Sequence, residues 1–117
     1  MSWPVELRVA AGGRALSVAF DGGESITLDA EYLRVESPSA EVQGHVAAQK
    51  QIVPGKRNVA IENLEPVGNY AVRILFDDGH DTGLYSWDYL LELAHTRERK
   101  WAEYLAALKA RGLGREG

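Results

Sequence analysis

The sequence predicts a small α+β domain, in which a β-rich part made of antiparallel hairpins precedes one or two C-terminal helices. Two observations lead to this fold class. Short segments of alternating apolar and polar residues, separated by Gly- and Asp-rich turn signals, occupy most of residues 1–96, and the apolar residues take up helical spacing from about residue 87. At 117 residues the chain has the size of one folding unit, which we divide into a β-rich domain (1–96) and a C-terminal helical extension (97–117).

The N-terminal part predicts a hairpin preceded by one more strand. Residues 16–20 and 25–28 both alternate between apolar and polar side chains, and Asp21-Gly22-Gly23 between them is a turn signal. Residues 5–10 alternate in the same way. We therefore expect three strands before residue 30.

The middle of the chain predicts a short helix, a loop and two further strands. A Ser-Pro pair at residues 37–38 supplies an N-cap and a first helical position, so a helix or turn should run from there to Gly44. Residues 47–57 are polar and read as an exposed loop. Residues 59–64 and 70–76 alternate, and Asp78-Gly79 after the second strand predicts a type I′ turn.

The C-terminal part predicts helix. Ser86 is a good N-cap residue, so a helix should begin at about Trp87. One bent helix, or two helices with a break near His95-Thr96, would both fit. The apolar stripe serves either as core or as a surface for self-association or a partner, so a homo-oligomer through this helix is one expectation. The stripe consists of Trp87, Leu91, Ala94, Trp101, Leu105 and Leu108.

A weak internal repeat links the two halves of the β-rich part. Residues 20–33 contain Phe-Asp-Gly, a Leu and a Tyr-Leu step, and residues 76–90 repeat this order with one residue inserted. Two such hairpins would be repeated units of one small sheet assembly. Hairpins also share turn chemistry without any relation between them.

Composition excludes several classes of function. The chain has no Cys, which rules out disulfides, thiolate zinc or iron–sulfur ligation and a Cys nucleophile, and favours the cytoplasm. The formal net charge is −4, and the six Lys and Arg residues of 97–117 fit a solvated helix face, so we expect no nucleic-acid partner. No signal peptide or apolar run of membrane-spanning length is present, and we expect no membrane partner.

The sequence lacks catalytic motifs. No phosphate-binding glycine loop and no nucleophile elbow is present, and no His is followed two residues later by an acid, which an iron dioxygenase site commonly requires. The acids near His80 have no fixed separation and no nucleophile beside them. We therefore expect no catalytic residues and no cofactor bound by a known motif.

One histidine lies among carboxylates and is the candidate for metal binding. His80 with Asp78 and Asp81, joined by His45 and Glu41 if the fold brings the loops together, would offer nitrogen and oxygen ligands to iron or another divalent ion. The alternative is that these residues decorate an exposed hairpin tip without any ligand.

Aromatic and small polar residues near the same hairpin form a candidate interaction surface, because aromatic side chains give large contact areas at low entropic cost. This surface comprises Ser37, Ser39, Asn69, Tyr70, Tyr85 and Trp87.

The segments 37–45, 65–72 and 76–90 together resemble the gamma-butyrobetaine hydroxylase-like N-terminal domain family, and the similarity covers about residues 5–95. The resemblance implies a small β-rich unit. Members occur as small bacterial proteins without assigned activity, at the N-terminus of gamma-butyrobetaine dioxygenases and beside Mrp-type iron–sulfur carrier ATPases. It therefore implies a link to iron or iron–sulfur metabolism.

The resemblance also implies a structural zinc held by three Cys and a His in the dioxygenases. His80 matches that His, whereas the Cys cluster would fall within residues 35–39, where this chain has no thiol. Serine is a poor zinc ligand, so the Cys-type zinc site is not expected here. The corner is then either empty of metal or rebuilt with oxygen ligands such as Glu36 or Glu41.

We therefore expect a non-catalytic accessory or interaction domain with a protein partner. A metal-binding protein that uses His80 is the first alternative. An oxidoreductase-associated domain without its own active site is the second.

Overall fold

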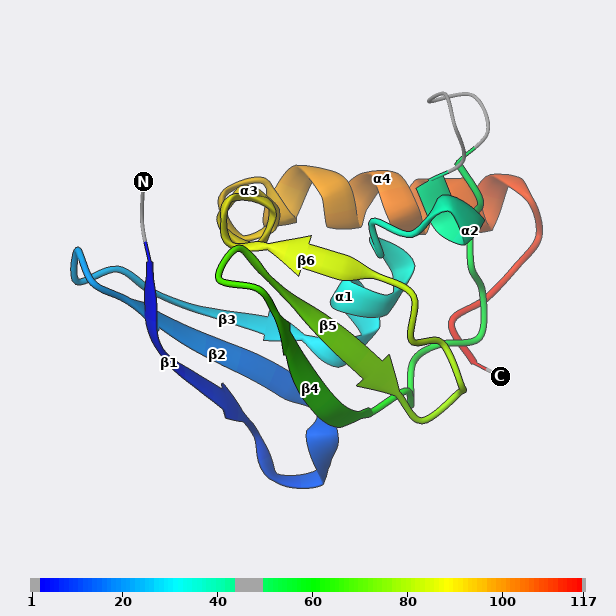
Figure 1. Cartoon of the computed structure of the whole chain (residues 1–117). Helices are drawn as coiled ribbons and strands as arrows, with labels where there is room; N and C mark the ends of the chain where they lie inside the picture. The colour runs from blue at the N-terminus through cyan, green and yellow to red at the C-terminus, as the bar shows by residue number, and fades with distance from the viewer. Residues whose placement is uncertain (1–2, 44–49, 117) are drawn as a thin grey trace.

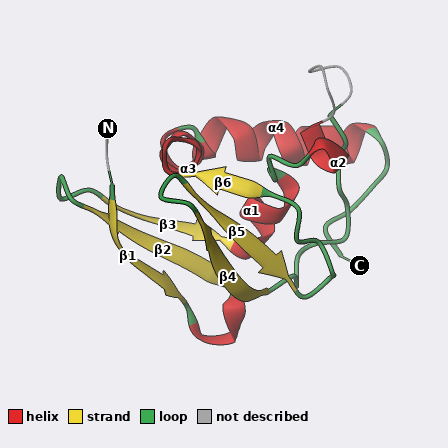
Figure 2. Cartoon of the chain, in the orientation of Figure 1, coloured by secondary structure: helices red, strands yellow, loops and turns green. Residues whose placement is uncertain are grey.

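The computed structural model describes residues 3–43 and 50–116, without the side chains of residues 40 and 41. Within these residues, six strands form two three-stranded antiparallel sheets, and helices cover them on one side (Figures 1 and 2). The predicted α+β fold of hairpins followed by C-terminal helices is confirmed, although the strands form two sheets rather than one. No helix in the described ranges combines the length and apolar character that a membrane span needs.

The first sheet has the strand order β1-β2-β3 and contains the predicted hairpin. Its strands are β1 (Pro4–Val9), β2 (Ala15–Phe20) and β3 (Ser25–Asp29), and a short 3-10 turn, η1 (Ala11–Gly13), joins the first two. Val18 pairs with Ile26 across the hairpin, and both side chains are buried. Alternation thus placed one face of this sheet in the core, as period-two patterning requires.

Two short helices follow. The helix α1 (Ala30–Val35) begins directly after β3 and is almost fully buried. The sequence did not predict it, because six residues span less than two turns and show no helical period. The helix α2 (Ala40–Gln43) lies within the predicted short helix but begins two residues after Pro38, the predicted first position, so Ser37 is not its N-cap. The predicted end at Gly44 lies outside the described residues.

The second sheet has the order β4-β5-β6 and contains the second predicted alternation. Its strands are β4 (Ile61–Val67), β5 (Ala71–Phe76) and β6 (Leu84–Ser86). The strand predicted over residues 70–76 begins one residue later, because Tyr70 lies in the turn before it. The predicted type I′ turn is wrong, because Gly79 has φ of +88° whereas Asp78, like every described non-glycine residue, has negative φ.

Two helices complete the chain, so the single bent helix is excluded. The helix α3 (Trp87–His95) begins at the predicted N-cap, where the Ser86 hydroxyl accepts a hydrogen bond from the Tyr89 amide at 3.1 Å. Thr96 separates it from α4 (Arg97–Ala110). The predicted stripe is interrupted on α4, where Tyr104 and Leu108 are buried but Leu105 is 39% exposed.

One apolar core joins both sheets to α1 and α3. It includes buried residues from each sheet and from both helices: Leu16, Val18, Leu28, Leu33, Val72, Ile74, Phe76, Leu90 and Leu93. A smaller cluster of Val35, Tyr104 and Leu108 packs α4 against α1. The hydrophobic effect of these two clusters holds the two halves together.

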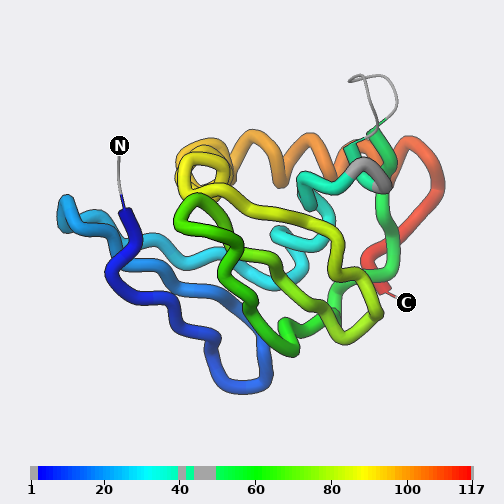
Figure 3. The backbone as a smooth tube through the Cα atoms, in the orientation of Figure 1, coloured from blue at the N-terminus to red at the C-terminus, as the bar shows by residue number. Residues whose placement is uncertain are grey.

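The C-terminal segment after α4 turns back along the loop that precedes β4 (Figure 3). The amides of Gly55 and Arg57 donate to the carbonyl oxygens of Gly114 and Arg115 at 2.9 and 3.0 Å. The Arg115 guanidinium donates two hydrogen bonds, of 2.8 and 2.7 Å, to the buried carboxylate of Glu31. The segment is therefore tied to α1 as well as to the loop.

Candidate functional site

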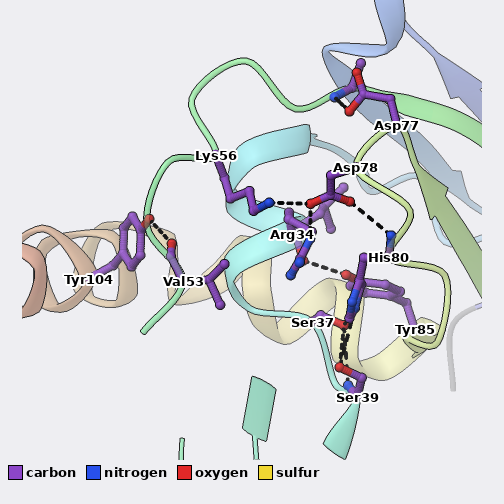
Figure 4. Close-up of polar contacts among 12 residues, drawn as sticks. Arg34, Ser37, Ser39, Val53, Lys56, Asp77, Asp78, His80, Tyr85 and Tyr104 are labelled. Atoms are coloured by element: carbon purple, nitrogen blue, oxygen red, sulfur yellow. Dashed lines mark hydrogen bonds and ion pairs between the residues drawn. The ribbon is translucent and has the colours of Figure 1, made fainter. Parts of the chain in front are cut away.

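The first candidate site is the corner around His80, which lies in the connection between β5 and β6. The His80 Nε2 atom lies 2.9 Å from the Ser37 hydroxyl and 3.4 Å from the Ser39 hydroxyl (Figure 4). Ser37 follows α1 and Ser39 precedes α2, so the imidazole joins the second half of the chain to the first. The two serine hydroxyls also lie 3.2 Å apart.

An ion-pair cluster borders this corner. The Asp78 carboxylate accepts hydrogen bonds from Arg34 Nε at 2.8 Å and from the His80 amide at 3.1 Å, and Lys56 Nζ lies 2.7 Å away (Figure 4). Burial acts to raise the pKa of Asp78, but the bonds from Lys56, His80 and Arg34 outweigh it and lower this pKa to about 2. The Arg34 Nη1 atom is buried and has no hydrogen-bond partner among the described residues.

The two serine hydroxyls of this corner are closed to a substrate, whereas His80 is half-buried. Ser37 is fully buried and Ser39 nearly so. Gly83 packs so closely that a Cβ atom there would lie 2.5 Å from the Ser37 hydroxyl. The Tyr85 hydroxyl donates to the Leu33 carbonyl at 2.5 Å behind it, and burial raises the Tyr85 pKa well above its usual range. A Ser–His hydrogen bond in such a place stabilises the fold and offers no reachable nucleophile.

The described residues contain no group of three or more His, Asp or Glu side chains placed to hold a metal ion. His80 and Asp78 therefore do not form such a group with Asp81. The His45 of the predicted set lies outside the described residues, as does the side chain of Glu41, so the metal site stays a prediction that depends on them.

Glu36, suggested as a replacement ligand, pairs with Lys50 at 2.7 Å. One imidazole and two serine hydroxyls do not fit the structural zinc that the family resemblance implies, because zinc prefers thiolate and imidazole ligands.

The second candidate site is an aromatic pocket beside the turn between β4 and β5. It has a volume of about 140 Å³ and is lined by Trp3, Tyr70, Ser86, Trp87 and Asp88. Three segments that are distant in sequence meet there: the residue before β1, the β4–β5 turn and the start of α3. We call these five residues the aromatic pocket.

Neighbouring contacts hold the pocket in shape. The Trp87 indole donates to the Asn69 carbonyl at 3.0 Å, which fixes its ring against the turn. The Trp3 amide lies 3.2 Å from an Asp21 carboxylate oxygen, and the Asp21 amide donates to the Trp3 carbonyl at 2.8 Å. Trp3 is thus attached to the turn between β2 and β3, and Trp87 to the turn between β4 and β5.

Tyr70 differs from the four other tyrosines of the chain. Each of those donates its hydroxyl to a backbone carbonyl inside the fold. Tyr70 is 55% exposed, and its hydroxyl has no hydrogen-bond partner within the described residues. The four others are Tyr32 to Leu93 at 2.8 Å, Tyr85 to Leu33 at 2.5 Å, Tyr89 to Glu36 at 2.5 Å and Tyr104 to Val53 at 2.6 Å.

The structure divides the predicted interaction surface. Asn69 and Tyr70 are exposed and Trp87 lines the aromatic pocket, whereas Ser37, Ser39 and Tyr85 are buried and present no surface. The buried three lie there because the β5–β6 connection folds over the end of α1. The sequence did not indicate the pocket residues Trp3, Ser86 and Asp88 as part of this surface. Trp3 could have been included because it is a large aromatic residue that lies outside the alternating pattern of the first predicted strand.

Comparison with known proteins places the chain in a family. The family model described as gamma-butyrobetaine hydroxylase-like, N-terminal, matches residues 7–91. A comparison with curated proteins gave no match.

Solved structures agree with this match. Two NMR solution structures are 47% and 44% identical to this chain, with TM-scores of 0.85 and 0.83. The alignments cover 98% and 99% of this chain, and 86% and 91% of those proteins. A crystal structure of a DUF971 family protein of unknown function from Acidithiobacillus ferrooxidans is 40% identical, with a TM-score of 0.65, over 78% of this chain and 91% of that one. The resemblance seen in the sequence is confirmed, and the chain belongs to the gamma-butyrobetaine hydroxylase-like N-terminal domain family.

Proposed function

We propose that this protein is a non-catalytic accessory domain that binds a protein partner through the aromatic pocket. The observation that carries the proposal is the exposure of Trp3 and Tyr70, which are 41% and 55% exposed beside the nearly buried Trp87. Burial of large aromatic side chains dominates the energy of protein interfaces, and such residues are enriched at binding hot spots. An exposed pair around a preformed pocket is therefore suited to binding.

The rest of the molecule favours binding over catalysis. Ser37, which would be the nucleophile of a hydrolytic site with His80 as its base, is fully buried, and Gly83 packs against its hydroxyl. The polar groups of that corner are used to join the two halves of the chain. Protein recognition needs only an accessible surface, which the aromatic pocket supplies.

The partner is proposed to belong to iron or iron–sulfur metabolism. This narrower proposal rests on the family resemblance alone. It directs the search for a partner to extracts of cells grown with limiting and with sufficient iron.

Affinity capture with Tyr70 variants tests the proposal. We expect the wild-type chain to recover a specific partner from extracts of its native cells, and the Tyr70→Ala variant to lose it. Leu105→Ala is the matched control, because it also removes an exposed apolar side chain, 39% exposed, but on α4 and away from the pocket. Capture of no specific partner, or equal capture by Tyr70→Ala, would contradict the proposal.

A further inference from the structure

The first sheet ends at a strand that has a partner on one side only. β1 stands at the end of the strand order β1-β2-β3, and among the described residues it pairs with β2 alone (Figure 1). Its register against β2 shifts between Pro4 and Glu6 and is regular from Glu6 to Val9. Residues 6–9 therefore form a regular edge to which a further strand can be added.

The backbone groups of Leu7 and Val9 point to the open side of this edge. The Ala10 amide donates to the Ala15 carbonyl across the sheet at 2.9 Å, and the backbone groups of every second residue in a strand point to the same side. The amide and carbonyl of Arg8 therefore face β2, whereas those of Leu7 and Val9 face outward. An added strand would form its hydrogen bonds with these two residues.

The side chains of the edge are arranged symmetrically about Leu7. Leu7 and Val9 are half-buried and pack against the core. Glu6 and Arg8 flank Leu7 on the outer face, 3.3 Å apart, with side chains that are 58% and 71% exposed. One residue of each charge sign thus stands at the same distance in sequence from Leu7.

A second copy of β1 complements this arrangement. In an antiparallel pair centred on Leu7, the two Leu7 residues lie opposite each other and exchange backbone hydrogen bonds. Glu6 of each copy then lies opposite Arg8 of the other. These neighbouring positions are not hydrogen-bonded to each other, so their side chains approach most closely, and opposite charges there stabilise the pair.

The charges also select this register. The outward-facing backbone groups permit pairing that is shifted by two residues, but such pairing places Arg8 opposite the Arg8 of the other copy, or Glu6 opposite Glu6. Like charges directly opposite one another destabilise a strand pair. Charged side chains commonly protect an edge strand from pairing for this reason, whereas the register centred on Leu7 removes the repulsion.

We propose that two copies of this chain form a symmetric dimer through antiparallel pairing of β1 with β1, centred on Leu7. The two first sheets then form one continuous sheet across the twofold axis. The paired segment is short, so the dimer is weak and its population depends on protein concentration. The aromatic pocket takes no part in this pairing, so the dimer can fail its test while the proposed function stands.

Analytical ultracentrifugation of charge-reversal variants, at protein concentrations from about 10 μM to about 1 mM, tests the proposal. The average mass of the wild-type protein should rise with concentration toward that of two chains. Glu6→Arg alone and Arg8→Glu alone each place like charges opposite one another at both positions beside Leu7, and each should weaken association at least about tenfold. An equal mixture of the two variants restores opposite charges across the pair and should associate as the wild type does.

The matched controls are Glu103→Arg and Arg99→Glu, because they make the same charge changes in an exposed ion pair of α4, whose side chains are 64% and 62% exposed. Both should associate as the wild type does. NMR spectra of the same samples report whether each variant keeps its fold. Hydrogen exchange of the Leu7 amide should slow as the concentration of wild-type protein rises, because this amide becomes hydrogen-bonded in the dimer.

Several results would overturn the proposal. These are a wild-type chain that stays monomeric up to about 1 mM, association that neither reversal on β1 weakens, and a mixture of the two variants that does not associate. Association that is lost with Leu105→Ala would also overturn it, because the contact would then lie on α4.

Discussion

Replacement of Asp78 by Asn should destabilise the protein by an amount that depends on pH. Asp78 sits between Arg34 and Lys56, at 2.8 and 2.7 Å, and its side chain is only 19% exposed. An amide keeps the shape of the carboxylate but removes its charge. The two cations then face one another without a counter-charge, beside an Arg34 Nη1 atom that already has no partner in the described part of the chain.

The size of the effect follows from the lowered pKa. The Asp78 pKa falls from 3.8 to about 2 on folding, and each pKa unit corresponds to about 1.4 kcal/mol. The full shift would give about 2 kcal/mol, and solvent screening of a partly exposed pair reduces this, so we expect a loss of about 1–2 kcal/mol at pH 7. Because the folded-state pKa is the lower one, this stability is present above pH 3.8 and disappears as the pH falls through 2.

Urea unfolding followed by tryptophan fluorescence at several pH values measures the difference. The gap between wild type and Asp78→Asn should be constant from pH 7 to 5 and should shrink to about half near pH 3. Asp29→Asn is the matched control, since it removes an ion pair with Arg97 whose side chains are 61% and 55% exposed, and it should cost well under 1 kcal/mol. A gap equal to that of the control, or one that stays unchanged down to pH 3, would refute the reasoning.

Three further predictions concern the other contacts of the fold. Arg115→Ala leaves the carboxylate of Glu31, whose side chain is 8% exposed, without its partner and should cost about 2–3 kcal/mol in urea unfolding. Arg111→Ala, which removes an exposed cation from the same end of the chain, should cost little, and similar losses for both would contradict this role. Gly83→Ala would place a methyl group 2.5 Å from the Ser37 hydroxyl, which contacts His80, and should lower the free energy of unfolding by about 1–3 kcal/mol. Unchanged stability would show that the neighbouring side chains move to accommodate the methyl group. Titration of the wild-type protein and of His80→Ala with zinc and with iron(II) tests the predicted metal ligands. If His80 is a ligand, His80→Ala should bind more weakly, and equal binding by both proteins would exclude His80 as a ligand.

Patterns that repeat along the chain predicted the fold well. Alternation at residues 16–20, 25–28 and 70–76 identified strands, because each has one face in the core and one away from it. Ser86 identified the start of α3 because the cap is made by the residue itself. The break at Thr96 could not be decided, because the apolar spacing continues across it.

The candidate site was harder to predict because it depends on distant contacts. Ser37 and Tyr85 resemble surface residues in sequence, but the path of the β5–β6 connection buries both. Trp3 and Asp88 have no common local pattern, and only the tertiary fold brings them to one pocket. The prediction at Asp78-Gly79 was wrong because a type I′ turn needs positive φ at both residues, whereas only Gly79 has it.

The weak repeat in the sequence has a structural counterpart in the two halves of the molecule. Each half consists of three antiparallel strands followed directly by a helix, and each helix carries the Tyr of the repeated Tyr-Leu step. Tyr32 of α1 donates to the Leu93 carbonyl of α3, and Tyr89 of α3 donates to the Glu36 carbonyl just after α1. Burial raises the pKa of both phenols, that of Tyr32 to about 12, so both hydroxyls keep their protons and donate at any physiological pH. The two halves are thus joined by reciprocal bonds as well as by the His80 corner, and the polar groups at their junction serve the fold. The aromatic pocket lies outside this junction, so we expect Tyr70→Ala to remove the proposed binding and to leave the domain folded.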